Sequence, residues 1–415
     1  MIIKKLFYVQ KITHCLFFLL LSSFSFAQLN VELVGQLSYD SVRCNDIWGY
    51  VAPDSSEYAI FGTFDGVSVV NVTDPYNPTE VDFIEQQGSI WRDIKTWGEF
   101  AYVTSDAGGT TDGLLVIDLT SLPDSISYVN MNPTVPGGAR INRCHNIYID
   151  EFGFAYLAGC NVNSGGLVVF DVKTTPGDPI LSGLAPNEYS HDVYVRDNMA
   201  YSAEINIGVF SVYDVSDKDN MTLIAQQPTP FRFTHNLWLS DDGNTIFTTD
   251  ELANAPVASY DISDLTDIQL LDEYRPSATL NDGVIPHNVH VWDDWLIISY
   301  YSDGCIIVDA SKPDNLVEVG NFDTFLPNAQ GFNGAWGAYP FLPSGNILIG
   351  DINAGLFVLG PTYVRAAHLE GTVTDAATGI GINNATISVK EINLIENSKA
   401  DGQYKTGSHS SGAYM

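Results

Sequence analysis

The chain has 415 residues, with 50 Asp and Glu against 18 Lys and Arg, and its formal net charge is -32 at pH 7. A surface this negative repels nucleic acid and anionic membranes and attracts cations, which excludes nucleic-acid binding as the expected function. Hydrophobic residues make up 45% of the chain and aromatic residues 12%, which is too much for a disordered polymer.

The amino terminus is typical of a secretory signal peptide. Three lysines precede or flank the start of the apolar run CLFFLLLSSFSF, and small residues then allow cleavage after Ala27. The apolar run is shorter than the roughly 20 residues of a membrane span, and no second such run follows in the sequence. We therefore expect residues 1–27 to be removed, and the mature chain to be secreted or held at the outer cell surface without a transmembrane span.

Seven similar strand openings recur from residue 44 onward, at spacings of 44 to 53 residues. Most continue with a turn, two short strands such as AYVTSD and GLLVIDL, and a fourth strand after a Pro/Asp turn. Four short β-strands repeated at this period predict an all-β protein with a seven-bladed β-propeller over residues 28–360. The openings are CNDIWGY, WRDIKTW, CHNIYID, SHDVYVR, THNLWLS, PHNVHVW and FNGAWGA.

Closure of the ring is predicted from its two ends. The seventh unit ends after its third strand, GLFVLG, whereas the mature chain begins with the unpaired strand VELVGQLSYD, which resembles the fourth strand VEVGNFDT. We expect the amino-terminal strand to complete the last blade, because this arrangement hides the sheet edges. A large all-β sandwich is the alternative, but it leaves the regular motif unexplained.

The third and fourth strands resemble the LVIVD repeat, as in LLVIDLTSLPD, LVVFDVKTTPGDP and CIIVDASKPDNLVEVG. The repeat region as a whole is similar to the choice-of-anchor B family of exported bacterial proteins. In that family such repeats precede a variable carboxy-terminal anchoring or sorting segment. The resemblance implies the propeller architecture and surface anchoring, but it implies no particular activity.

From His368 the pattern changes to HLEGTVTDAATGIGINNATISV, followed by DGQY. These elements resemble a carboxypeptidase regulatory-like domain, which implies a small Ig-like or transthyretin-like β-sandwich over residues 361–415. The resemblance concerns the fold, and we carry over no peptidase activity from it. The chain stops where that fold still needs closing strands, so we expect this domain to be incomplete and the anchor, for example a type IX sorting signal, to lie beyond it.

Four of the seven openings place a histidine directly before an Asn or Asp. The first strand of each propeller blade lines the central channel, so these histidines should stand around one channel mouth. Asn45, Arg92 and Asn333 occupy the equivalent places in the other three openings. The four histidines are His145, His191, His235 and His287.

Carboxylates in the loops between second and third strands should surround the same mouth. Imidazole and carboxylate groups together suit a divalent cation such as zinc, manganese, iron or nickel, and neighbouring histidines also serve as general acids or bases. We therefore predict a ligand site made by the four histidines with Asn45, Arg92, Glu204 and Asp250, and a divalent metal ion held by the histidines as the candidate cofactor. The loop carboxylates are Asp65, Asp106, Glu204, Asp250, Glu251, Asp303 and Asp351.

A purely structural explanation of the repeated histidine stays open and is ranked first. Repeats conserve hydrogen bonds between strands, and the Asn or Asp that follows bonds backbone groups readily. His290 alternates with Trp292 on one strand and is expected to be packed. The tryptophans that follow the channel pattern are expected to pack between blades, with a carbohydrate platform as the second option.

Four cysteines remain after the signal peptide, and sequence alone does not decide their pairing. Cys144 and Cys160 flank a hairpin that turns at DEFG, which predicts a disulfide, with free buried thiols as an equal alternative. The other two are Cys44 and Cys305.

Two functions of different class follow. The first is a surface-displayed binding module for an extracellular protein, a glycan or a small ligand. The second is an enzyme, a metal-assisted hydrolase or lyase at the channel mouth. The sequence favours the first, because it holds a loop-lined channel but no P-loop, GxSxG elbow or HExxH motif.

Overall fold

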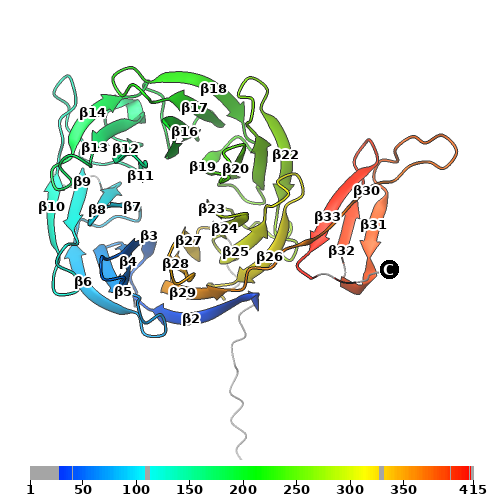
Figure 1. The fold of residues 1–415 in the computed structure, drawn as a ribbon, viewed down its shortest axis with the longest axis horizontal. Helices are drawn as coiled ribbons and strands as arrows, with labels where there is room; N and C mark the ends of the chain where they lie inside the picture. The colour runs from blue at the N-terminus through cyan, green and yellow to red at the C-terminus, as the bar shows by residue number, and fades with distance from the viewer. Residues whose placement is uncertain are drawn as a thin grey trace, which may run out of the picture.

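The computed structural model describes residues 28–39, 41–107, 113–326, 331–392, 394–410 and residue 412. The expected signal peptide, residues 1–27, lies outside the described residues. Seven antiparallel sheets stand around a central channel, each with one strand innermost (Figure 1). This arrangement confirms the predicted seven-bladed β-propeller.

The first four blades follow the chain, and their strands are given from the channel outward. Blade one is β3 (Cys44–Val51), β4 (Glu57–Thr63), β5 (Gly66–Asn71) and β6 (Thr79–Glu85). Blade two is β7 (Arg92–Trp97), β8 (Phe100–Ser105), β9 (Leu114–Asp118) and β10 (Ser127–Met131). Blade three is β11 (Asn146–Ile149), β12 (Phe154–Ala158), β13 (Val168–Asp171) and β14 (Ile180–Leu184). Blade four is β15 (Asp192–Arg196), β16 (Met199–Glu204), β17 (Val209–Asp214) and β18 (Thr222–Pro228).

The last three blades include both ends of the propeller chain. Blade five is β19 (Thr234–Leu239), β20 (Thr245–Asp250), β21 (Val257–Asp261) and β22 (Gln269–Tyr274). Blade six is β23 (Asn288–Trp292), β24 (Trp295–Ser299), β25 (Cys305–Asp309), β26 (Val317–Phe322) and β1 (Gln28–Leu29). Blade seven is β27 (Ala335–Tyr339), β28 (Ile347–Asp351), β29 (Gly355–Pro361) and β2 (Val31–Leu37).

The amino-terminal strand closes the ring as the sequence predicts. β2 pairs antiparallel with β29, with Leu33 opposite Leu359, and so forms the outermost strand of blade seven. The sequence did not indicate β1, in which Gln28 and Leu29 add a short fifth strand to blade six opposite Phe322 and Asn321. One continuous segment therefore joins two neighbouring blades.

The middle strands of the blades are buried because neighbouring blades cover both faces of each sheet. β4 and β28 are buried along their whole length, whereas the outermost strand β10 is largely exposed. The middle strands of the blades are therefore encoded by short, largely apolar runs rather than by alternating apolar and polar residues.

The aspartate that ends each LVIVD-like run caps the turn that follows. The Asp118 carboxylate accepts a hydrogen bond from the Thr120 backbone N–H at 2.9 Å, and Asp171 does the same for Lys173 at 2.9 Å. The same contact recurs in the later blades at Asp214, Asp261 and Asp309. This repeated residue is therefore explained by turn chemistry.

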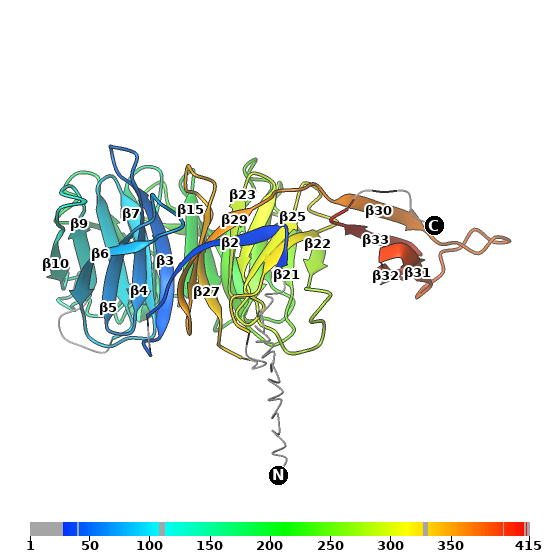
Figure 2. The same cartoon turned by 90° about the horizontal axis from the view of Figure 1, so that it is seen from below.

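The strand directions define two faces of the propeller (Figure 2). The loops that lead into the innermost strands and the loops between second and third strands open on one face, which we call the mouth face. The remaining loops open on the opposite face. All the histidines of the repeated motif therefore enter the channel from the mouth face.

Two two-stranded sheets follow the propeller. One pairs β30 (Ala367–Thr372) with β33 (Gln403–Ser408), and the other pairs β31 (Thr386–Val389) with β32 (Leu394–Asn397). The expected sandwich over residues 361–415 stays a prediction. Two short 3₁₀ helices, Asn163–Gly165 and Lys390–Ile392, complete the described elements, and no described helix is long and apolar enough to cross a membrane.

Candidate functional site

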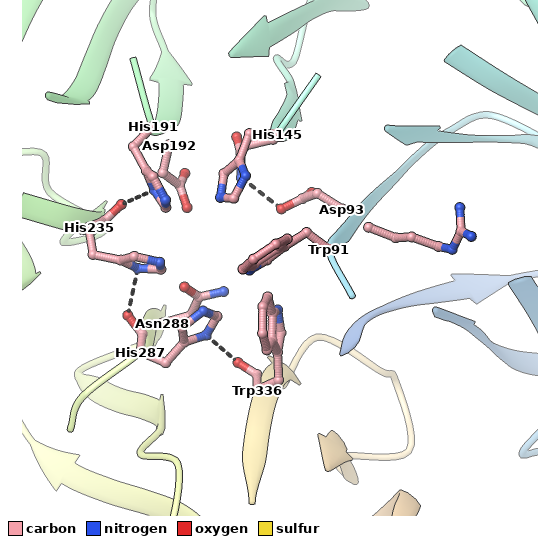
Figure 3. Close-up of a pocket in the computed structure, with 11 residues that line it drawn as sticks. Trp91, Asp93, His145, His191, Asp192, His235, His287, Asn288 and Trp336 are labelled. Carbon is pink, nitrogen blue, oxygen red and sulfur yellow. Dashed lines mark hydrogen bonds between the residues drawn. The ribbon is translucent and has the colours of Figure 1, made fainter. Parts of the chain in front are cut away.

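A ring of six aromatic side chains stands at the mouth end of the channel (Figure 3). Successive imidazole centroids lie 4.2, 4.4 and 4.5 Å apart, and the His287 ring lies 4.7 Å from the Trp336 ring. Trp91 completes the circle, with its centroid 6.3 Å from His145 and 6.5 Å from Trp336. We call this set the mouth ring: Trp91, His145, His191, His235, His287 and Trp336.

Hydrogen bonds to the backbone of the next blade hold three of the imidazoles. Nδ1 of His191 donates to the carbonyl of His235 at 3.3 Å, and Nδ1 of His235 donates to the carbonyl of His287 at 3.2 Å. Nδ1 of His287 donates to the carbonyl of Trp336 at 2.5 Å. Because a carbonyl only accepts, Nδ1 carries the proton, and in the neutral ring Nε2 keeps a free lone pair.

Burial keeps most of the mouth ring uncharged. It lowers the pKa of His191 and His287 well below the usual histidine value, helped by the neighbouring imidazoles. The pKa of His235 is also lowered by burial, although Glu251 opposes the shift. His145 differs: burial lowers its pKa, but the Asp106 carboxylate at 2.7 Å from Nδ1 outweighs this and the net direction is upward.

One carboxylate reaches two of the imidazoles. Glu251 Oε2 lies 3.7 Å from His235 Nε2, and Oε1 lies 3.9 Å from His287 Nε2. The Tyr301 hydroxyl donates to Oε1 at 2.5 Å and so orients the carboxylate. Three ligand atoms of these residues all lie within 4.8 Å of one another, the one such group found within the described part of the chain. His145 and His191 are not members of it.

Free space inside the mouth ring is small. The cavity that these side chains enclose measures about 20 Å³, which is room for one water-sized ligand or one metal ion. A larger molecule would have to sit above the ring and insert a single group into it.

The seventh opening enters the channel three residues later than the sequence motif predicts. Gly337 pairs with Gly350, as Asn288 pairs with Ser299 in blade six. Trp336 therefore takes the histidine position, and assigning Asn333 to this position was wrong. Asn333 lies in the loop before β27, where its Oδ1 accepts a bond from Asn353 at 3.4 Å.

Arg92 and Asn45 contact the neighbouring loop of blade one. The Arg92 guanidinium donates to the carbonyls of Thr63 at 2.9 Å and Gln87 at 2.6 Å, and the preceding residue, Trp91, enters the mouth ring instead. Asn45 is fully buried, and its amide donates to the Ser89 carbonyl at 3.4 Å. Arg92 lines the cavity wall, whereas Asn45 is not among the lining residues.

Glu204 and Asp250 bind groups within their own blades. Glu204 accepts hydrogen bonds from Ser211 and Tyr213, both at 2.6 Å, across to the third strand. Asp250 accepts bonds from Thr229 Oγ1 at 2.6 Å and from the Phe233 N–H at 2.8 Å. Asp250 thus fixes the loop that leads into His235, which makes it a positioning residue in this geometry. Among the other predicted carboxylates, Asp65 is exposed, Asp303 is partly buried and Asp351 is buried.

A second polar layer lies one residue deeper in the channel, at the Asn or Asp position of the motif. Lys95 Nζ lies 2.6 Å from Asp93 and 4.0 Å from Asp46. Burial and the Asp93 charge raise the pKa of Asp46 to about 8, and the same two causes raise that of Asp192 to about 7. We call this set the lower layer: Asp46, Asp93, Lys95, Asn146, Asp192, Asn236 and Asn288.

A disulfide joins Cys144 to Cys160 directly beside the mouth ring. Cys144 precedes His145, so the bond ties the entry to blade three to the loop after β12. Cys44 and Cys305 are free and buried.

No family model matches the chain, and no curated protein matches it. Among solved structures, the fold is similar to the periplasmic gluconolactonase PpgL of Pseudomonas aeruginosa, with a TM-score of 0.53 and 12% sequence identity. The match covers 86% of this chain and 94% of that one. At this identity the likeness shows the shared β-propeller fold.

Proposed function

We propose that this chain is an exported β-propeller that works as a binding module, and that it holds a divalent cation at the channel mouth as part of its ligand site. The observation that carries the proposal is the group of His235, His287 and Glu251, whose ligand atoms lie within 4.8 Å of one another. Two neutral imidazoles and one carboxylate leave further coordination positions for a ligand.

The surroundings of the three residues support cation binding. Each imidazole donates Nδ1–H to a carbonyl, and Tyr301 holds the carboxylate, which is the outer hydrogen bonding that metal ligands usually have. Nitrogen and oxygen donors together suit zinc, manganese, iron or nickel. The net charge of -32 raises the local concentration of any cation.

Export is supported by the basic and apolar amino-terminal segment and by the Cys144–Cys160 disulfide, which suits an oxidising compartment. The resemblance to choice-of-anchor B proteins adds surface anchoring to this proposal.

Metal analysis and calorimetry with Zn²⁺ and Mn²⁺ on the purified chain test the proposal. We expect one ion per chain, an affinity loss of at least 100-fold in His287→Ala, and a smaller loss in Glu251→Gln. His191→Ala is the matched control, because it removes an imidazole of the same ring and leaves the three ligands in place. No bound ion, or equal losses in His191→Ala and His287→Ala, would contradict the proposal.

A second candidate function is a metal-assisted hydrolase or lyase. The His145–Asp106 pair favours it. Although burial opposes the shift, the Asp106 carboxylate at 2.7 Å from Nδ1 raises the pKa of His145, whereas burial lowers the pKa of the other three imidazoles, and groups with pKa values moved apart in this way suit acid–base catalysis. The gluconolactonase named above makes a sugar lactone the first substrate to try. Metal-dependent hydrolysis of glucono-δ-lactone that His145→Ala abolishes would favour the enzyme, and no turnover with intact metal binding would favour the binding module.

A further inference from the structure

The loops of the two faces differ in their basic residues. The mouth-face loops contain arginine and no lysine, whereas the loops between strands on the opposite face contain lysine. Arg196 at the end of β15 and Arg365 after β29 also lie at the opposite face, and both form ion pairs there. The arginines are Arg43, Arg140, Arg143, Arg232 and Arg275. The lysines are Lys173, Lys218 and Lys312.

Two of the exposed arginines lie near the mouth ring. Arg143 lies two residues before His145, in the loop that leads into blade three, and its carbonyl accepts a hydrogen bond from the Asn161 N–H at 3.2 Å. Arg43 lies in the loop that leads into blade one, where its carbonyl accepts a hydrogen bond from the Phe64 N–H at 2.7 Å. Both arginines are therefore placed to meet a charge that approaches the channel.

These arginines lack an anionic partner within the described part of the chain. Arg196, Arg275 and Arg365 each form an ion pair with a neighbouring carboxylate. Among the described residues, no carboxylate lies within 4.0 Å of the guanidinium of Arg43 or Arg143. Their guanidinium groups are therefore available to pair with an external carboxylate, which arginine binds through two parallel hydrogen bonds.

Large apolar side chains lie exposed among the arginines. Phe64, Trp91, Phe231 and Phe332 are 41%, 39%, 40% and 54% exposed, and each comes from a different mouth-face loop. The Phe332 ring packs edge-on against Tyr301 at 5.3 Å, which joins this surface to the Glu251 site. We call these four residues, with Arg43 and Arg143, the rim.

The side chains on this face favour a protein ligand over a saccharide. Aromatic residues and arginine are enriched at protein interfaces and lysine is depleted, which is the pattern of these loops. Exposed aliphatic residues, Ile207 at 43% and Leu252 at 37%, lie in loops of the same face. Aliphatic side chains form no hydrogen bonds with sugar hydroxyls, but they bury apolar surface against apolar side chains of a protein.

We propose that the rim docks a protein segment that carries apolar side chains and carboxylates, with one carboxylate at the opening of the mouth ring. Arg43 and Arg143 pair with the acidic groups, and the exposed aromatic residues bury the apolar ones. The small cavity has room for the cation alone, so one carboxylate oxygen meets it at the opening of the ring and the rest of the segment stays on the rim. This last step rests on the proposed function, since the cation at His235, His287 and Glu251 receives that carboxylate.

A random twelve-residue peptide display library, selected on the full chain, tests the proposal. We expect the selected peptides to combine Asp or Glu with Leu, Phe or Trp, and the best of them to bind at least 10-fold more weakly to Arg43→Glu/Arg143→Glu. Lys173→Glu/Lys390→Glu is the control, because it changes the net charge equally at exposed positions away from the mouth. Phe332→Ala should weaken binding without any change of charge.

The outcomes separate this inference from the proposed function. Peptide binding that the rim substitutions weaken and that a metal chelator also weakens supports both the docking surface and the cation. Peptide binding that the rim substitutions weaken but a chelator leaves unchanged supports the docking surface and contradicts the cation. Selected peptides that bind the rim variants as well as the parent chain would overturn the inference. So would a polygalacturonate oligomer that binds through the rim more tightly than any selected peptide.

Discussion

The mouth ring and the lower layer come from neighbouring residues where the chain enters the innermost strands, yet their polar atoms are used differently. In the lower layer most groups bond to one another: Asn146 donates to Asp93 at 2.7 Å, and Asn236 donates to Asp192 at 3.0 Å. In the mouth ring three of the four imidazoles donate Nδ1–H to backbone carbonyls, which leaves their Nε2 atoms for a ligand. A repeated dipeptide can thus combine a structural position with a ligand-binding one.

The largest effect is expected in the lower layer. Lys95→Met leaves the buried carboxylates of Asp46 and Asp93 without their cation, and we expect the free energy of unfolding to fall by about 3 to 5 kcal/mol at pH 8. Urea denaturation of the variant and the parent chain measures this difference in the free energy of unfolding. Lys312→Met, which removes an exposed ion pair to Glu370, should cost less than about 1 kcal/mol, and equal losses would show that the buried pair has no special role.

The disulfide beside the mouth ring should give the next largest effect. Cys144 and Cys160 are separated by 16 residues, and opening a loop of this size costs about 3 kcal/mol. We expect the Cys144→Ala/Cys160→Ala variant to lose about this much in urea denaturation. A reductant should lower the stability of the parent chain and leave the variant unchanged; a reductant effect on the variant would contradict this.

Stability should rise as the pH falls from about 9 to about 6. Asp46 and Asp192 take up protons in the folded chain near pH 8 and pH 7, whereas in the unfolded chain they stay ionised down to about pH 4, so the folded state binds more protons in this window. Each carboxyl contributes at most about 1.4 kcal/mol per pH unit.

Thermal unfolding across this range measures the pH effect. Asp46→Asn should remove much of the change in melting temperature between pH 9 and pH 6. Asp54→Asn at an exposed site should leave that change intact, because hydrogen bonds from Ser56 lower the pKa of Asp54 and its carboxylate titrates below this pH range. A parent chain whose melting temperature is flat between pH 6 and 9 would refute the buried ionisation.

The smallest effect on stability is expected at the carboxylate of the mouth. Tyr301→Phe removes one hydrogen bond, worth about 1 kcal/mol of folding free energy, but frees Glu251, so Zn²⁺ affinity should fall about tenfold. Tyr50→Phe is the control, since its buried hydroxyl has no hydrogen-bond partner in the described part of the chain. A loss of stability without a loss of affinity would make Tyr301 purely structural.

The sequence identified the histidines of the site but not all of their neighbours. The regular spacing placed His145, His191, His235 and His287 at one channel mouth, and Glu251 was among the expected loop carboxylates. Trp91, Trp336 and Tyr301 were missed, because the first two are shifted from the motif by one and three residues and Tyr301 lies outside it. Glu204 and Asp250 share the loop position of Glu251, and only side-chain packing directs them into the blades.

By itself the sequence determined the period, the number of blades and the closing strand, because strand alternation, turn residues and repeat length are local properties of the chain. The tertiary structure decided which polar atoms face one another across the channel. His235, His287 and Glu251 come from two neighbouring blades and meet only when the ring closes, with Tyr301 holding the carboxylate between them. Contacts between blades depend on side-chain direction and strand register, which repeat spacing does not specify.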